Sequence, residues 1–195
     1  MRLIVGISGA SGVIYGIRLL EVLKTLSDVE SHLVISNGGK LNIALETEWQ
    51  VKEVEALADV VHSDQNLAAI ISSGSYRTDG MVLVPCSMKT LSGVVNSYAE
   101  SLIVRAADVV LKESRRLVLV PRETPLHVGH CYLMHEAAKM GAILVPPMPA
   151  FYHVPQSVDD IINQTVGRLL DQFDIDSGLV KRWQGAGQRS SNKGD

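Results

Sequence analysis

The strongest constraint on this chain is an alternation of short apolar runs with stretches in which apolar residues recur at helical spacing. The first run, Leu3–Ile7, is followed by glycines and serines and then by a helical pattern that continues to Leu26. Short runs that are apolar at every position are typical of strands covered on both faces of a parallel sheet. The alternation therefore predicts an α/β fold, a flavodoxin-like or Rossmann-like three-layer sandwich around a mostly parallel sheet.

The same pattern recurs along the chain. We expect strands at residues 32–36, 80–85, 116–120 and 142–145, and helices at residues 38–48, 87–95, 101–114, 132–140 and 157–173. Residues 61–80 fit neither pattern well, although residues 66–71 could form a short helix and residues 72–75 a loop.

Length and composition indicate one domain. The chain has 195 residues, 46% of them hydrophobic, which is enough for one sizeable core and short for two. The periodicity ends near residue 176, and the last residues are small and polar. We therefore expect a single domain over residues 1–175 and a tail, residues 176–195, that is mobile or contacts another subunit.

Charge and cysteine usage restrict the class of protein. The net charge is −3 at pH 7, and the basic residues are scattered, which argues against a nucleic-acid or anionic membrane surface. No apolar run approaches the length of a membrane span, and the first residues lack the pattern of a signal peptide. The two cysteines, Cys86 and Cys131, form no CxxC pair and fit a reducing compartment. We expect a cytosolic protein that binds neither nucleic acid nor membranes.

Small and hydroxylated residues follow several of the expected strands. Open parallel sheets bind ligands beyond the carboxyl ends of their strands. Glycine and serine at these ends let backbone N–H groups and helix N-termini approach a phosphate closely. The segments are Ser8–Gly12, Ser36–Gly39, Pro85–Thr90 and Pro121–Pro125. They predict a site for a phosphorylated ligand.

The first of these loops differs from the familiar nucleotide-binding motifs. Its sequence from Gly6 to Gly12, GISGASG, is neither GxGxxG nor the Walker pattern GxxxxGK[ST]. The acidic residue that would hold the ribose of a dinucleotide is also not clearly present, because Asp28 and Glu30 both precede the second strand and do not lie at its end. The loop therefore disfavours NAD.

A second anion site could form from residues elsewhere in the chain. Arg105 and Lys112 are seven residues apart in an expected helix and so share one face, which taken alone is more typical of a solvated basic face than of a binding site. Arg168 lies in the last helix, and Tyr152 follows the rigid proline-rich loop at residues 146–149. Two cationic positions, a third cation and a phenol could together bind a phosphate.

Three further sets of residues are candidates for a chemical role: an acid, a cysteine and a cluster of histidines. Glu123 follows Arg122 at a strand end and could be a surface carboxylate or a pocket acid/base. Cys86 has no partner base nearby in the sequence and is more typical of a buried filler than of a nucleophile. The histidines and cysteine between residues 127 and 135 match neither HExxH nor a zinc-finger spacing, so we expect no metal site.

Together these segments resemble those of the UbiX-like flavin prenyltransferases, whose bacterial branch was once described as phenylacrylic or hydroxyaryl acid decarboxylases. The resemblance extends to about Trp183. It rests on GISGASG (6–12), PCSMKTL (85–91), RAADV and LKE (105–113), LVLVPRETPL (117–126) and PPMPAFYH (146–153).

This resemblance implies an activity. The family is flavodoxin-like and homo-oligomeric, a dodecamer, with FMN bound between subunits. It transfers the dimethylallyl group of dimethylallyl monophosphate to N5 and C6 of reduced FMN without a metal. The product, prenylated FMN, serves UbiD-like decarboxylases.

The resemblance also implies roles for individual residues. Glu123 would act as acid/base and Ser11 as proton relay. The prenyl phosphate would lie against Arg105, Lys112, Tyr152 and Arg168. Three cations and a phenol would stabilise the negative charge that develops on the phosphate when the allylic C–O bond breaks. FMN would contact Gly9, Ala10, Ser11, Ser36, Ser87, Met88, Lys89, Thr90 and Arg122.

One segment departs from the family pattern. Members commonly have Ser-x-x-His-Leu-Glu-Asn-Met after the Pro-Arg-Glu segment, whereas this chain has HVGHCYLM over residues 127–134. The change leaves the implied catalytic residues in place and bears on local packing and prenyl-donor preference.

Two other functions remain as alternatives. A flavin-dependent cysteine decarboxylase of the phosphopantothenoylcysteine type normally carries Pro-x-Met-Asn, where this chain has PPMP at residues 146–149. A non-catalytic FMN-binding subunit of a decarboxylase would need only the flavin contacts. It would not need Glu123 or the three cations.

Overall fold

The structure is a computed structural model and describes residues 1–185. It divides into two compact units, Met1–Pro147 and Met148–Asp195. The expected tail, residues 176–195, falls partly outside the described residues. The single domain over residues 1–175 stays a prediction.

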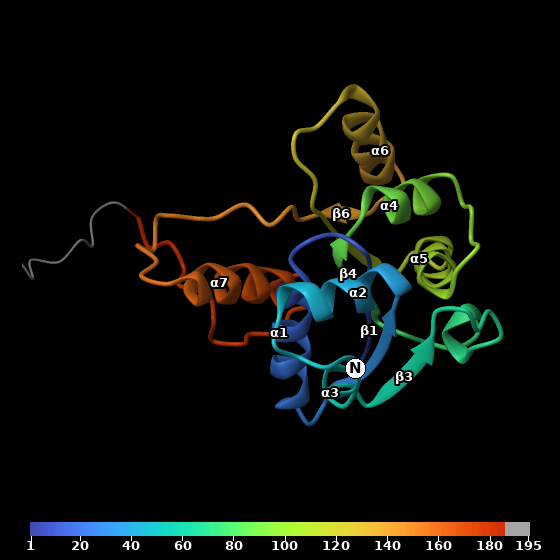
Figure 1. The fold of residues 1–195 in the computed structure, drawn as a ribbon, viewed down its shortest axis with the longest axis horizontal. Coiled ribbons are helices and arrows are strands. Elements are labelled where there is room, and N and C mark those ends of the chain that lie inside the picture. The colour runs from blue at the N-terminus through green and yellow to red at the C-terminus, as the bar shows by residue number, and fades with distance from the viewer. Residues whose placement is uncertain (186–195) are drawn as a thin grey trace, which may run out of the picture. The chain divides into compact units, whose positions relative to one another are not determined.

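Within the described residues, six strands of the first unit form one sheet (Figure 1). They are β1 (Arg2–Ile7), β2 (Glu30–Ile35), β3 (Val60–Ser63), β4 (Gly80–Cys86), β5 (Arg116–Pro121) and β6 (Ile143–Leu144). Neighbouring strands pair in parallel, in the order β3-β2-β1-β4-β5-β6. This confirms the predicted α/β fold, and the order is that of a Rossmann-type, doubly wound sheet. The order reverses between β1 and β4, so the carboxyl ends of these strands form the switch point at which such sheets bind ligands.

The helices follow the predicted alternation. They are α1 (Val13–Lys24), α2 (Asn37–Glu46), α3 (Val51–Glu55), α4 (Met88–Val95), α5 (Leu102–Lys112), α6 (Val128–Lys139) and α7 (Val158–Asp171), the last in the second unit. None of them has the length and apolar character needed to cross a membrane, as far as residues 1–185 are concerned.

Four local differences separate the structure from the predicted elements. Strand β3 is an edge strand whose exposure alternates, so it lacks a continuous apolar run. The five-residue helix α3 buries Val54 alone. Residues 66–71 form no α-helix, and a 3₁₀ turn, η1, spans Ile70–Ser72 instead. Helix α6 begins four residues earlier than predicted because the His127 side chain accepts a hydrogen bond from the Gly129 N–H and caps it.

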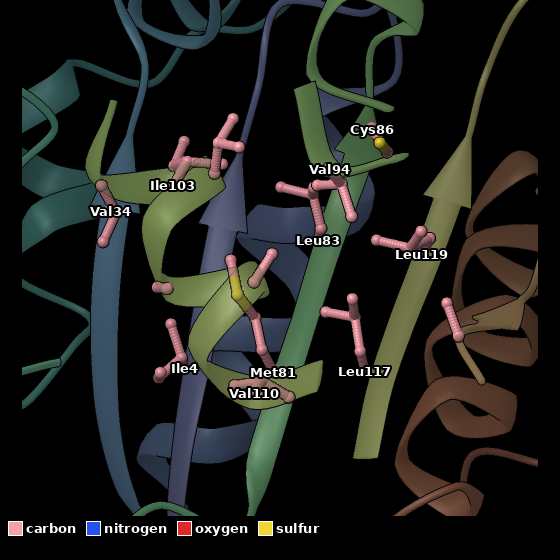
Figure 2. Close-up of a cluster of buried hydrophobic side chains, with 14 of the residues drawn as sticks. Ile4, Val34, Met81, Leu83, Cys86, Val94, Ile103, Val110, Leu117 and Leu119 are labelled. Atoms are coloured by element: carbon pink, nitrogen blue, oxygen red, sulfur yellow. The ribbon is translucent and has the colours of Figure 1, made fainter. Parts of the chain in front are cut away.

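The main core lies between the sheet and helices α4, α5 and α6 (Figure 2). Helix α5 contributes Ile103 and Val110 to it. Alternate residues of the strands supply the other side, as the two-residue period of a strand requires: they include Ile4, Met81, Leu83, Leu117 and Leu119, which are almost wholly buried.

Helix α1 covers the opposite face of the sheet. At Gly16 it lies so close to β4 that an added Cβ would be 2.6 Å from the Val84 carbonyl oxygen. Burial on both faces explains why the strands are apolar at nearly every position.

Candidate functional site

Ser8 joins the two strand ends at the switch point. Its side chain is fully buried, donates a hydrogen bond to the Pro85 carbonyl oxygen at 2.9 Å and accepts one from the Ser87 N–H at 2.8 Å. The loop after β1 and the loop after β4 are therefore held side by side. Sequence reasoning gave Ser8 no role of its own, because both partners are more than 75 residues away.

The glycines of the first two loops allow direct contact between backbones. An added Cβ on Gly9 would lie 3.0 Å from the Gly38 Cα, and one on Gly39 would lie 2.5 Å from the Ile7 carbonyl oxygen. Both neighbours are backbone atoms, so neither can move aside cheaply. The loops after β1, β2 and β4 thus meet at one edge of the sheet.

Two serines cap the helices that start at this edge. The Ser36 Oγ accepts a hydrogen bond from the Gly39 N–H at 3.1 Å, and the Ser87 Oγ accepts one from the Thr90 N–H at 3.2 Å. Each first turn still presents further N–H groups that have no partner within the helix, and its dipole favours an anion. The predicted flavin contacts Ser36 and Ser87–Thr90 therefore lie where a phosphate fits.

The start of helix α1 already holds an anion. The Glu46 carboxylate accepts hydrogen bonds from the Gly12 N–H at 2.8 Å and the Val13 N–H at 3.4 Å. Sequence reasoning missed Glu46 because it ends α2, more than 30 residues from these partners. Ser11 lies exposed in the same loop, beside the segment that Glu46 fixes. The backbone N–H groups that remain for a phosphate at this edge are therefore chiefly those at the starts of α2 and α4.

The Arg122–Glu123 segment reaches the same edge from β5. The Arg122 N–H donates to the Cys86 carbonyl oxygen at 3.3 Å, which ties the segment to the end of β4. Glu123 is exposed in the single chain, and its carboxylate accepts a hydrogen bond from the Thr124 N–H at 3.0 Å. Glu123 therefore acts as a pocket acid/base only if a ligand or another chain covers it.

Each cation predicted to bind the prenyl phosphate lies beside an acid. The N–O distances are 2.9 Å for Arg105–Asp108, 2.5 Å for Lys112–Glu113 and 2.6 Å for Arg168–Asp171. The hydrogen bond and charge of Lys112 hold the pKa of the Glu113 carboxyl below its usual value, so that Glu113 stays anionic. These acids orient the cations.

Helix α5 presents two of the cations on one face, as predicted. The Arg105 Nε donates to the Ser72 carbonyl oxygen at 3.1 Å, and a Cβ on Gly74 would lie 2.7 Å from the Lys112 Nζ. Both side chains are thus turned toward the Ser72–Gly74 segment.

Lys112 and Glu123 lie at opposite ends of the sheet. Lys112 ends α5 just before β5 begins, whereas Glu123 follows the far end of β5. A strand of six residues spans about 20 Å. Lys112 and Glu123 of one chain therefore do not meet at one small ligand.

The second unit carries the other two predicted phosphate contacts. The Tyr152 hydroxyl accepts a hydrogen bond at 2.7 Å from Gln164 Nε2, and Gln164 lies one turn of α7 before Arg168. Burial alone would raise the pKa of Asp171, but hydrogen bonds from Arg182 and Arg168 lower it overall. Helix α7 thus carries Arg168 and, through Gln164, binds the Tyr152 hydroxyl.

Two further sequence expectations concern a cysteine and a metal site. Cys86 is fully buried, as predicted, and burial raises the pKa of its thiol. Between residues 1 and 185, no three His, Cys, Asp or Glu side chains are grouped to hold a metal ion.

Comparison with known proteins first identifies the class. A family model described as Flavoprotein matches residues 1–169, which agrees with a phosphate-binding edge at the switch point. The flavin prenyltransferase UbiX of Salmonella typhimurium is 62% identical over 187 residues, which are 95% of this chain and 99% of that protein. The chain belongs to the UbiX-like flavin prenyltransferase family.

Two solved structures agree with this assignment. The dodecameric FMN-dependent UbiX-like decarboxylase from Escherichia coli O157:H7 has a TM-score of 0.94 and 53% identity, covering 95% of this chain and 100% of that one. AnUbiX, solved in complex with FMN and dimethylallyl pyrophosphate, has a TM-score of 0.92 and 49% identity, covering 94% and 97%. The predicted family, fold and FMN cofactor are confirmed.

Proposed function

We propose that this chain transfers a dimethylallyl group from dimethylallyl monophosphate to N5 and C6 of reduced FMN, and that its product serves a UbiD-like decarboxylase. The observation that carries the proposal is the 62% identity to a flavin prenyltransferase over nearly the whole of both chains. When bound, FMN supplies the ring atoms that are alkylated.

The switch-point edge would hold the flavin. The starts of α2 and α4 would bind its phosphate through backbone N–H groups and the capping hydroxyls of Ser36 and Ser87. Gly9, Ala10 and Ser11 would line the same edge from the loop after β1. The remaining predicted contacts are Met88, Lys89, Thr90 and Arg122.

The prenyl donor would be bound by cations without a metal. Breaking the allylic C–O bond leaves negative charge on the phosphate, which Arg105, Lys112 and Arg168 would stabilise. Tyr152 would add a hydroxyl donor. Because an acid already orients each cation, little side-chain freedom would be lost when the phosphate binds.

Proton transfer would fall to Glu123 and Ser11. Substitution at a ring carbon releases one proton, which we assign to the Glu123 carboxylate. The Ser11 hydroxyl would relay protons from the opposite loop. Glu123 is exposed in the single chain, so this assignment requires the site to close around it.

We also infer that the chain works as a homo-oligomer, because Lys112 and Glu123 of one chain lie too far apart to meet at one donor. We further infer that it acts in the cytosol. The Escherichia coli relative is described as dodecameric, and a dodecamer is the proposed assembly here. AnUbiX was solved with dimethylallyl pyrophosphate, so dimethylallyl diphosphate should be assayed as a donor beside the monophosphate.

The direct test is anaerobic incubation of the protein with reduced FMN and either donor, followed by mass analysis of the extracted flavin. We expect the flavin mass to rise by one dimethylallyl unit with the monophosphate. Bound FMN of unchanged mass with both donors would contradict prenyl transfer and favour a flavin-binding subunit.

A further inference from the structure

We propose that Gln164 is a positioning residue that makes the Tyr152 hydroxyl a hydrogen-bond donor to the prenyl phosphate. The inference rests on the proposed function, in which Tyr152 binds the donor. It adds that Gln164 determines the direction in which the Tyr152 hydroxyl donates its hydrogen bond.

The amide orientation of Gln164 is fixed by a backbone group. Gln164 is 4% exposed, with its Oε1 3.0 Å from the Lys181 backbone N and its Nε2 2.7 Å from the Tyr152 hydroxyl oxygen. A backbone N–H can only donate, so the amide oxygen must face Lys181. The amide NH₂ must then face Tyr152.

This orientation determines the polarity of the phenol. A tyrosine hydroxyl has one hydrogen to donate and lone pairs that accept. Since its oxygen accepts from Gln164, its hydrogen remains for another partner. The unprotonated oxygens of a phosphate only accept, and a hydrogen bond to an anion is stronger than one between neutral groups. Tyr152 is 43% exposed, so its hydroxyl is within reach of a ligand.

The segment after α7 supports this arrangement. An added Cβ on Gly167 would lie 2.6 Å from the Val180 Cγ2, so the segment at Leu179–Lys181 lies directly against α7. The same segment supplies the Lys181 N–H. The Trp183 ring meets the Tyr152 ring edge-on, with 5.9 Å between centroids. Part of the segment expected as a tail thus holds both Gln164 and Tyr152.

Two substitutions of Gln164 separate polarity from packing. In Gln164→Glu the carboxylate accepts from Lys181 and also takes the Tyr152 hydrogen, which turns the lone pairs of the phenol toward the phosphate. Gln164→Met removes both hydrogen bonds and leaves the hydroxyl free to rotate. A purely structural role would make the methionine variant the worse of the two for donor binding.

We would measure the KM for dimethylallyl monophosphate, kcat, and donor binding to protein loaded with oxidised FMN. We expect Gln164→Glu to raise KM about tenfold or more and Gln164→Met to raise it less, with kcat changed less than KM in both. The matched control is Gln156→Glu, which adds the same charge at an exposed glutamine of the same unit and should leave KM unchanged.

The Tyr152→Phe background distinguishes polarity from simple charge repulsion. We expect the difference between Gln164→Glu and Gln164→Met to shrink strongly there, because no hydroxyl remains to be reoriented. A difference that persists would overturn the inference, as would wild-type KM in Gln164→Glu. If the glutamate variant fails to bind FMN, Gln164→Met decides alone, and its effect must vanish in the Tyr152→Phe background.

Failure of the proposed function looks different. Wild-type protein that neither binds the donor nor yields a heavier flavin would overturn both proposals. Wild-type protein that forms product while the Gln164 variants match it would overturn only the inference about Gln164.

Discussion

At the scale of single residues, contacts within one helix can be predicted from the sequence, whereas contacts between distant segments cannot. Asp108 and Asp171 lie three residues after Arg105 and Arg168, a spacing at which helical side chains meet, so these pairs could be predicted. The partners of Ser8 and Glu46 lie far away in the sequence, and no local pattern indicates them. Contacts that depend on the meeting of separate loops could not be predicted.

Glu123 provides the first test at this scale. Glu123→Gln keeps the size of the side chain and removes its capacity to hold a proton as a carboxylate. We expect FMN to remain bound while turnover falls at least about a hundredfold, because proton transfer by a positioned side chain contributes that much or more. Flavin fluorescence titration and single-turnover assays would measure the two effects. Near-normal turnover would remove Glu123 from the mechanism.

Arg168 tests the division of the site into two anion-binding parts. Arg168→Ala should raise the KM for dimethylallyl monophosphate by about tenfold or more while the Kd for FMN stays unchanged, because a lost charge-assisted contact affects only its own ligand. Lys139→Ala, which breaks the exposed Lys139–Glu136 pair on α6, is the matched control. A loss of FMN affinity instead would show that the two parts are assigned wrongly.

His62 predicts a pH effect on stability away from the site. Its ring stacks on His32, with 2.9 Å between His62 Nε2 and His32 Nδ1. Burial, and then the neighbouring His32, lower the pKa of His62 from its usual value of 6.5. Below pH 6.5 the unfolded chain therefore binds a proton at His62 more readily than the folded chain does. The free energy of unfolding falls as the pH drops below 6.5. Urea unfolding at pH 7.5 and 5.5 should show a smaller loss in His62→Gln than in the wild type; equal losses would contradict this.

At the scale of elements, burial decided what the sequence could predict. The central strands are covered on both faces and could be recognised from unbroken apolar runs. The edge strand β3 and the five-residue helix α3 bury too little to leave such a pattern. The meeting of the loops after β1, β2 and β4 at one edge could be predicted, because parallel strands place their carboxyl ends together.

Gly16 tests how closely α1 packs on the sheet. Alanine is favoured over glycine inside a helix by roughly 0.5–1 kcal/mol. At Gly16, however, the Cβ would lie 2.6 Å from a backbone carbonyl oxygen of β4, which cannot move without shifting the strand. We expect Gly16→Ala to lower the free energy of unfolding by about 1–3 kcal/mol. Gly93→Ala in α4 is the control, because its nearest neighbour is the movable side chain of Val104. A stabilised Gly16→Ala protein would show that α1 is packed less tightly.

At the scale of the whole molecule, one chain carries parts of the site that face different ways. Lys112 and Glu123 lie at opposite ends of β5, yet the proposed reaction needs both at one donor. Copies of the chain must then share each site, with Lys112 from one and Glu123 from another. An assembly of twelve 21.1 kDa chains would have a mass of about 250 kDa, which light scattering can measure.

Sharing of the site between chains is tested most directly by mixing two inactive variants. Glu123→Gln and Lys112→Ala chains would be co-expressed in equal amounts, and the flavin product of the mixed oligomers measured. If each site takes Lys112 and Glu123 from different chains, about one quarter of the sites regain both residues, and activity should approach one quarter of wild type. Activity no higher than that of either variant alone, in oligomers shown to be mixed, would contradict a site shared between chains.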